Sequence, residues 1–279
     1  MNAEFSNVYD DEARSDAYAQ LEFPGTYYLA YRDLGTIIKE HVSGRKALDF
    51  GCGAGRSTRF LRGIGFQAAG VDIAAPMLER ARERDPEGDY RLELDGDLTS
   101  LPLGTYDLVL SAFTFDNIPI MERRVALFQS LRRLLTESGR IVNLVSSPEI
   151  YVNEWASFST KAFPENRTAR SGDKVRIVML DVEDRRPVED ILWTDEDYHE
   201  VYRRSGLVPI RTYRPLARTS EPFPWVSETT IAPWTVYVLQ DERSSFRHTG
   251  QQRHAADALA RAAACRALGA PKRLHIVYV

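Results

Sequence analysis

The residues with the clearest chemical meaning are three glycines that follow an acidic residue at the end of an apolar run. The sequence there reads L-D-F-G-C-G-A-G-R, in which Asp49 precedes Gly51, Gly53 and Gly55. Glycine lets the backbone turn tightly and approach a ligand, and the free N–H groups of a following helix start can bind it. The pattern is typical of a loop for a nucleoside-containing cofactor. A dinucleotide loop would need glycine where Arg56 stands, which argues against an NAD-dependent oxidoreductase.

Acidic residues recur at the ends or starts of the next strand-like segments. Asp72 closes the run F-Q-A-A-G-V-D about twenty residues after the loop, where a carboxylate can accept both hydrogen bonds of a ribose diol. Asp97 follows a third segment, and Asp107 opens a fourth. The four segments in this order resemble the class I S-adenosylmethionine-dependent methyltransferases, over residues 28–240 and most strongly over 45–145.

The resemblance implies S-adenosyl-L-methionine as cofactor and a set of residues around it. The glycine loop with Asp49 would hold the cofactor, Asp72 its ribose, Ile73 and the pair Asp97 and Leu98 its adenine, and Ser111 and Phe113 would lie near the sulfonium. Arg32 is expected to bind the methionyl carboxylate. Tyr18 and Tyr28 are expected to cover the sulfonium, whose positive charge is attracted to aromatic ring faces.

The fold class that follows is α/β. We expect a Rossmann-like class I methyltransferase fold, with a seven-stranded, mostly parallel sheet, helices on both faces and a β-containing insertion after the fifth strand. Two β-type runs, residues 174–182 and 187–193, predict a hairpin in that insertion. The predicted organisation is a helical N-terminal lid (1–44), a methyltransferase domain (45–240) with a substrate cap (148–194), and a tail of unassigned role (241–279).

Helical spacing is clearest before the fifth strand. Val125, Phe128, Leu131 and Leu135 repeat at three- and four-residue intervals, which predicts a helix that buries this stripe. The arginines of this segment are expected largely on the opposite side: Arg123, Arg124, Arg132 and Arg133.

Composition restricts the class of protein. No apolar run approaches the ~18 residues of a membrane span, and the start of the sequence lacks the features of a signal peptide, so a cytoplasmic location is predicted. Cys52 and Cys265 offer no disulfide framework, and the cysteines and histidines form no metal-ligand cluster. We therefore expect no metal, no membrane partner, and a monomer or homodimer.

Net charge and one missing motif bear on the acceptor. The chain carries a net charge of −4, and because residues 241–279 hold seven Lys/Arg and three Asp/Glu, residues 1–240 carry −8. Such a body disfavours a phosphate backbone as partner. The segment S-A-F-T-F-D-N-I-P also lacks the Pro-Pro-aromatic element that suits a flipped base. A small-molecule acceptor is predicted and nucleic acid is not. The alternatives are an RNA or protein methyltransferase and a cofactor-binding protein without transfer activity.

Methyl transfer from a sulfonium is an in-line displacement that needs alignment and, for some acceptors, a base. The candidates for contact with the acceptor are Tyr18, Asp116 and Glu154. An amine acceptor requires a base and a carboxylate acceptor does not, so the sequence leaves O, N and C acceptors open.

Overall fold

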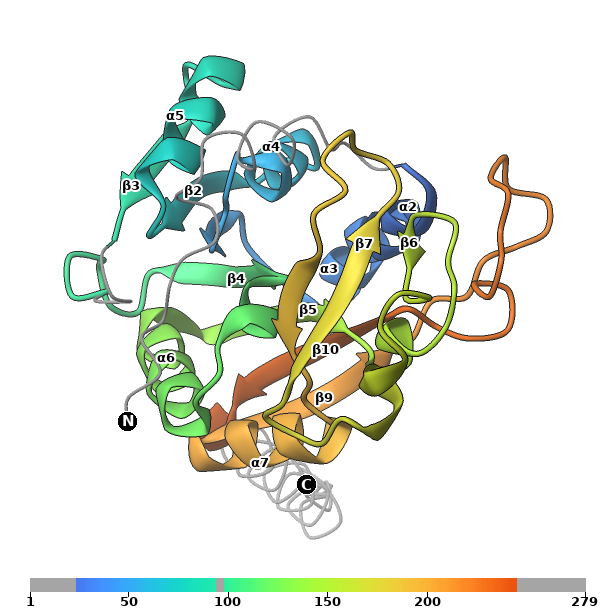
Figure 1. The fold of residues 1–279 in the computed structure, drawn as a ribbon. Coiled ribbons are helices and arrows are strands. Elements are labelled where there is room, and N and C mark those ends of the chain that lie inside the picture. Colours follow the sequence, from blue (N-terminus) through green and yellow to red (C-terminus); the bar gives the residue numbers. More distant parts are fainter. Residues whose placement is uncertain (1–23, 94–97, 245–279) are drawn as a thin grey trace, which may run out of the picture. The chain divides into compact units, whose positions relative to one another are not determined.

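A seven-stranded sheet in the order β3-β2-β1-β4-β5-β10-β9 is the centre of the described part of the chain, residues 24–93 and 98–244 (Figure 1). In this computed structural model the strands are β1 (Lys46–Phe50), β2 (Gln67–Asp72), β3 (Asp89–Leu92), β4 (Tyr106–Ala112), β5 (Leu135–Ser146), β9 (Leu207–Tyr213) and β10 (Trp234–Asp241). The first five pair in parallel, and β10 runs antiparallel to both β5 and β9. The predicted mostly parallel sheet is confirmed.

Successive residues of the central strands face opposite sides of the sheet, and each side is buried. Ala47, Leu108 and Val142 belong to one apolar cluster, whereas their neighbours Leu48 and Val109 belong to the other. The first cluster is covered by α2 (Gly25–Arg32), α3 (Leu34–His41) and α4 (Arg56–Gly63), and the second by α6 (Met121–Leu134) and α7 (Asp195–Arg204). A further helix of the described residues, α5 (Ala75–Arg84), packs beside β3. Burial on both faces explains why these strands read as nearly continuous apolar runs.

One expectation about α6 is wrong. Arg124 was expected on the solvent side of the helix, but it is fully buried. Its Nε donates to the carbonyl of Ile118 at 2.8 Å and its Nη2 donates to the carbonyl of Phe115, while the guanidinium lies 4.3 Å from the ring centre of Trp193. A guanidinium can be buried when backbone carbonyls and aromatic faces replace water, which a local helical pattern does not reveal.

The insertion after β5 contains the predicted hairpin. The strands β7 (Lys174–Met179) and β8 (Val188–Ile191) pair antiparallel, and the short β6 (Phe158–Ser159) adds a third strand to β7. Three 3₁₀ helices lie nearby in the fold: η3 (Thr114–Asn117), η4 (Pro148–Tyr151) and η5 (Pro164–Thr168). The hairpin contacts the ends of the main sheet, because β8 touches η3 and β7 touches η4.

A buried carboxylate joins three distant segments of this region. Glu228, in the long connection between β9 and β10, is fully buried. Its Oε1 accepts from Thr26 Oγ1 and from the N–H of Ala156, both at 2.7 Å, and its Oε2 accepts from the N–H of Val226 at 2.8 Å. Glu228 therefore fixes the start of α2 against the insertion.

The chain divides into two units, residues 1–241 and 242–279. Only residues 242–244 of the second unit lie within the described part of the chain. The boundaries of the lid, the cap and the tail stay predictions.

Candidate active site

The glycine loop turns directly from β1 into α4. Its glycines Gly51, Gly53 and Gly55 have φ angles of +72°, +52° and +77°, a region that side chains disfavour. A Cβ on Gly51 would lie 2.1 Å from Thr114 Oγ1, and one on Gly55 would lie 2.5 Å from the hydroxyl of Tyr90. The backbone therefore has no room for another residue at these two positions. Gly51 and Gly53 line a cavity, whereas Gly55 is not among the residues that line it and begins α4 as its N-cap.

Asp49 supports the loop from behind and does not line the cavity. It is fully buried, and its Oδ2 accepts from Ser57 Oγ and Thr58 Oγ1 in the first turn of α4, both at 2.6 Å. Burial raises the pKa of Asp49 to about 6, against these two hydrogen bonds. Its Oδ1 has no partner among the described residues. A buried carboxylate oxygen without a donor is costly, so this atom fits a ligand that brings a positive or N–H group.

Asp72 lines the cavity from the end of β2, and Ile73 follows it there. The carboxylate accepts from the N–H of Gly53 at 2.7 Å and from the N–H of Ala74 at 2.8 Å. Burial raises the pKa of Asp72, although the backbone donors oppose this shift. The residue thus ties the loop to the second strand and presents a carboxylate to the same cavity.

One cavity of about 220 Å³ joins the loop to the insertion. Its walls come from the loop and β2, from the end of β4 with Phe113, Asp116 and Asn117, and from the hairpin with Ile177, Met179, Val188 and Asp190. Phe113 has a φ of +64°, and its ring centre lies 4.8 Å from that of Trp234. The carboxyl edge of the parallel strands is the place where open α/β sheets bind ligands, and the hairpin contributes to the cavity at that edge.

The helix α2 reaches the cavity through residues other than those predicted. Tyr27 and Tyr31 line it, whereas Tyr28 is absent from its lining and packs against Phe223 with ring centres 5.0 Å apart. Arg56 also lines the cavity, with its guanidinium carbon 4.9 Å from the ring centre of Tyr27 and 5.4 Å from that of Tyr31. The aromatic and cationic groups on this wall are therefore Tyr27, Tyr31 and Arg56.

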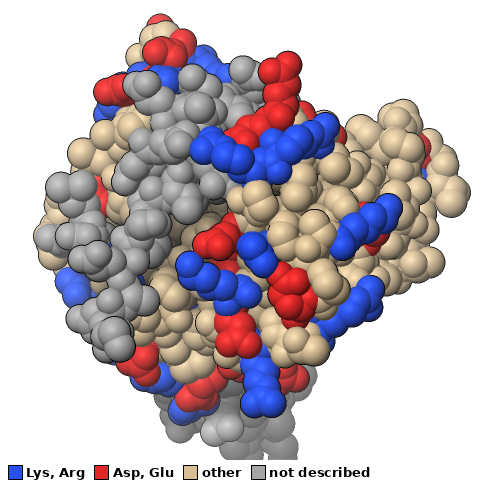
Figure 2. All heavy atoms as spheres, in the orientation of Figure 1, with Lys and Arg blue, Asp and Glu red and all other residues tan. Residues whose placement is uncertain are grey.

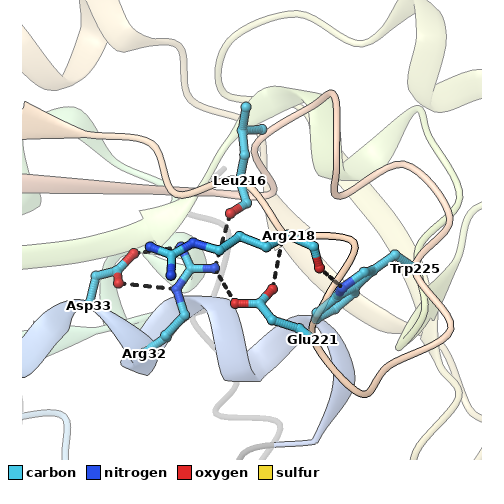
Figure 3. A network of polar contacts seen from close by, with 6 residues as sticks. All are labelled: Arg32, Asp33, Leu216, Arg218, Glu221 and Trp225. Atoms are coloured by element: carbon cyan, nitrogen blue, oxygen red, sulfur yellow. Dashed lines mark hydrogen bonds and ion pairs between the residues drawn. The ribbon is translucent and has the colours of Figure 1, made fainter.

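Arg32 lies outside the cavity in a surface network (Figure 3). Its Nη1 donates to Glu221 Oε1 at 2.6 Å and to the carbonyl of Leu216 at 3.1 Å, and its Nη2 pairs with Asp33 at 2.6 Å. Glu221 in turn accepts from the N–H of Arg218 at 2.8 Å. Arg32 thus fastens the β9–β10 connection to α2, and the structure does not bring it to the loop.

The remaining predicted site residues differ in whether they line the cavity. Asp116 lines the cavity, and Glu154 does not, because its carboxylate accepts from the N–H of Thr160 and from Ser159 Oγ, both at 2.8 Å, inside a turn of the insertion. Leu98 and Ser111 are buried without lining the cavity. Tyr18 and Asp97 lie outside the described residues.

A polar group that the sequence did not indicate completes the cavity. Tyr151 of η4 lines it and donates to Asp190 Oδ2 of β8 at 3.1 Å. Asp116 accepts from the N–H of Ser146 at 3.1 Å and from Tyr198 Oη at 3.3 Å. The sequence could have indicated Asp190. Side chains alternate along a strand, so Asp190 lies on the same face of β8 as the apolar Val188.

Features of two other classes of protein are absent from the described residues. In these ranges no three His, Cys, Asp or Glu side chains lie where they could together hold a metal ion. No helix there is long and apolar enough to cross a membrane.

Comparison with known proteins identifies the family. The family described as "Methyltransferase domain" matches residues 48–143, which contain the glycine loop, Asp72 and Asp116. The chain belongs to the class I S-adenosylmethionine-dependent methyltransferases. It is an S-adenosylmethionine-dependent methyltransferase, and its cofactor is S-adenosyl-L-methionine.

Three similar proteins show how far the likeness extends. An uncharacterized methyltransferase of Anoxybacillus flavithermus is 29% identical over 148 residues, which cover 51% of this chain and 67% of that protein. An 18S rRNA (guanine-N(7))-methyltransferase of Bos taurus is 34% identical over 104 residues, 34% of this chain and 37% of that protein. Among solved structures, the CcbJ methyltransferase of Streptomyces caelestis aligns with a TM-score of 0.58 and 18% identity, covering 81% of this chain and 95% of that one. The structural likeness shows the fold.

Proposed function

We propose that the protein transfers the methyl group of S-adenosylmethionine to a small molecule that binds between the glycine loop and the hairpin. One observation carries the proposal: a single cavity of about 220 Å³ is lined both by the loop residues Gly51, Gly53 and Asp72 and by the hairpin residues Met179 and Asp190. A cavity walled in this way suits a compact acceptor, because it is concave and mostly apolar with a few placed polar groups.

The residues that line the cavity near the glycine loop are the candidates for holding the cofactor. The loop glycines and Asp72 would receive its nucleoside, with Ile73 beside them. Arg56 replaces Arg32 as our candidate for the methionyl carboxylate, since it lines the cavity with Tyr27 and Tyr31. Because Asp49 does not line the cavity, its unpaired Oδ1 would accept from the methionyl ammonium through a bridging water. When bound, S-adenosylmethionine supplies a methyl carbon attached to a positively charged sulfur.

The aromatic side chains would bind and align the reactants. The ring centre of Tyr27 lies 5.8 Å from that of Phe113 and 5.1 Å from that of Phe158, and both of these pack on Trp234. Ring faces attract a sulfonium, and apolar walls keep water away from the reacting atoms. We assign residues 148–194 the role of a substrate cap on this basis. The N-terminal lid of residues 1–44 is retained as part of the proposal, carried here by the α2 residues Tyr27 and Tyr31.

The outer surface supports a small acceptor over a polyanion. Figure 2 shows Lys/Arg and Asp/Glu side chains interspersed over much of the coloured part of the viewed face. The hairpin itself carries opposite charges in pairs, including Lys174 with Glu189 at 3.1 Å and Arg186 with Asp184 at 2.8 Å. Binding to a nucleic acid backbone usually depends on a clustered basic footprint.

The test is to incubate the protein with methyl-labelled S-adenosylmethionine and a cell extract, and then to separate small molecules, RNA and protein. We expect label among the small molecules, and we expect the Asp72→Ala variant to lose it. An exposed carboxylate variant, Glu79→Gln, is the matched control and keeps it. Label found only in RNA or in protein would overturn the proposed acceptor class and leave the family and the cofactor unchanged.

A further inference from the structure

Two of the carboxylates that line the cavity, Asp116 and Asp190, have no role in the cofactor assignment. Asp116 follows β4 in η3, and Asp190 lies on β8 of the hairpin, so they come from segments far apart in the sequence. Tyr151 connects them electrostatically, because its hydroxyl donates to Asp190 at 3.1 Å while the charge of Asp116 also acts on it. With the amide of Asn117 oriented so that its nitrogen donates, that nitrogen reaches Asp190 Oδ1 at 3.2 Å.

The donors that stabilise Asp116 are neutral. It is 4% exposed and accepts from the Ser146 N–H and the Tyr198 hydroxyl. Within the described residues, no Lys, Arg or His nitrogen lies within 4.0 Å of its carboxylate. Burial raises the pKa of Asp116 to about 6, although the hydrogen bonds from Ser146 and the charge of Arg124 act in the opposite direction. Ionised, Asp116 is a buried charge that an added cation would stabilise.

The surrounding charges leave the cavity negative overall. Arg124 lies behind Asp116 and donates to two backbone carbonyls, so it offsets the carboxylate only in part. Six side chains with formal charge line the cavity, four of them acidic and two basic: Asp72, Glu93, Asp116, Asp190, Arg56 and Arg123. Burial raises the pKa values of Tyr151 and Tyr198, so both phenols remain protonated donors at neutral pH.

Around the two carboxylates the walls are apolar or aromatic. Ile150, Phe158, Ile177, Met179 and Val188 line the cavity from η4, β6 and the hairpin. These walls suit an apolar body, and the carboxylates suit a positively charged end. An anionic acceptor would meet two like charges, which disfavours it.

We propose that the acceptor is a small amine with an apolar body, that its nitrogen binds between Asp116 and Asp190, and that Asp116 accepts the proton which the ammonium must lose. The inference rests on the proposed function and deepens it. Asp116 is assigned the proton because it is the more buried of the two carboxylates, and this burial raises its pKa to about 6. Tyr151 and Asn117 act as positioning residues, since they orient Asp190.

The proton and electron balance is complete with the groups named. The ammonium gives one proton to Asp116, and the freed lone pair of the nitrogen forms the new N–C bond. The bound cofactor supplies the methyl carbon and retains the electron pair of the C–S bond that breaks, leaving as S-adenosylhomocysteine. The product is an N-methylated ammonium, and the proton on Asp116 passes to water when the product leaves.

The first experiment determines the chemical class of the labelled small molecule. An N-methylated amine moves into an organic solvent only from alkaline solution and resists alkaline hydrolysis, whereas a methyl ester releases labelled methanol in alkali. We expect a basic, alkali-stable product. A labelled ester, ether or C-methyl compound would overturn the amine inference while leaving the proposed function in place. Label confined to RNA or protein would overturn the proposed function itself.

The second experiment measures binding of the amine so identified to the protein saturated with S-adenosylhomocysteine, by calorimetry. Asp116→Asn and Asp190→Asn should each weaken it by about tenfold or more, because each removes one negative charge from the cavity that would pair with the ammonium. Glu189→Gln changes the neighbouring, outward-facing carboxylate and should leave the affinity unchanged. The affinity of the wild type should rise with pH between about 5 and 7 as Asp116 ionises, and Asp116→Asn should abolish that rise. Equal affinity in both Asn variants and wild type would overturn the inference.

A third measurement distinguishes the amine inference from the main alternative, in which Asp116 stabilises the positive charge of the sulfonium. S-adenosylmethionine carries the positive sulfur and S-adenosylhomocysteine does not. If the inference holds, Asp116→Asn binds the two cofactor forms with the same ratio of affinities as the wild type. A selective loss of S-adenosylmethionine binding, by about tenfold, would assign the carboxylate to the sulfonium and overturn the amine assignment. Because Asp190→Asn tests the same pocket from another element, a folding failure of one variant still leaves a result.

Discussion

Removing the carboxylate of Glu228 should both destabilise the protein and weaken cofactor binding. Glu228 accepts three hydrogen bonds at 2.7–2.8 Å and is fully buried, so truncation to alanine leaves three donors without an acceptor. Losing one partner of a buried charge-assisted contact costs about 1–3 kcal/mol, and the three are not independent, so we expect a loss of about 3–5 kcal/mol in unfolding free energy. This corresponds to a fall in melting temperature of roughly 6–20 °C.

The conservative variant Glu228→Gln allows a more specific prediction of the loss in unfolding free energy. In Glu228→Gln the carbonyl oxygen can keep the contacts with Thr26 and Ala156, but the amide nitrogen then faces the N–H of Val226. One contact of three becomes donor against donor, and the expected loss is about 1–3 kcal/mol. Because Thr26 precedes Tyr27 in α2, S-adenosylhomocysteine affinity should fall in the same order as stability.

Thermal unfolding and calorimetric titration of Glu228→Ala, Glu228→Gln and the exposed control Glu79→Gln would measure both effects. A melting temperature of Glu228→Ala within about 2 °C of the wild type would refute the reasoning, since it would mean that Thr26, Ala156 and Val226 find other acceptors or water. Loss of stability with unchanged cofactor affinity would show that α2 keeps its position without this contact.

Three further outcomes are expected. Asp72→Ala should weaken S-adenosylhomocysteine binding by about 1.5–3 kcal/mol in calorimetry while the protein stays folded, because it removes charge-assisted hydrogen bonds, and unchanged affinity would contradict its role. Gly51→Ala should abolish cofactor binding or folding, since its Cβ would lie 2.1 Å from Thr114 Oγ1 at a φ of +72°, whereas Gly63→Ala, with no atom within 4 Å of its Cβ, should be neutral in the same assays. For Asp116 the folded pKa of about 6 lies above the unfolded value, so its charge costs stability above pH 6 and this cost disappears as pH falls toward 4. Asp116→Asn should therefore melt higher than the wild type at pH 7.5, by up to about 3 kcal/mol in stability, and should lose that advantage at pH 4.5.

The sequence predicted the parts of the molecule that local patterns determine. The strand ending in Asp49, the glycines after it and the strand ending in Asp72 each combine a run of apolar residues with a turn signal, and the sheet formed from them as expected. The hairpin of the insertion also followed from its two β-type runs.

Long-range contacts account for what the sequence did not reveal. The sequence predicted Tyr28 at the cofactor, whereas the structure places Tyr27 in the cavity. Which of the two faces the cavity depends on the rotation of the short helix α2, and Glu228 fixes this rotation through Thr26, about two hundred residues away in the sequence. Arg124 was predicted to face solvent because the helical pattern does not reveal the carbonyls of Phe115 and Ile118 that accept its hydrogen bonds. Arg32 and Glu154 have charged side chains of the right type, but partners in the β9–β10 connection and in a turn hold them away from the cavity. Tyr151 and Asp190 become neighbours only when the hairpin folds back onto the sheet.

The contribution of separate stretches of chain to the cavity bears on how such a protein can diversify. Residues 48–143, where the family matches, hold the glycine loop, Asp72 and Asp116, whereas Tyr151, Met179 and Asp190 belong to the insertion beyond them. Exchange of the insertion between relatives could then alter acceptor choice in a single recombination event, without disturbing the cofactor loop. The contact of β8 with η3 sets the condition for such a graft, because a foreign hairpin must still pack beside Asp116. Homology confined to the shared stretch accordingly covers the cofactor loop and Asp116, and it leaves Tyr151, Met179 and Asp190 to the insertion of each relative.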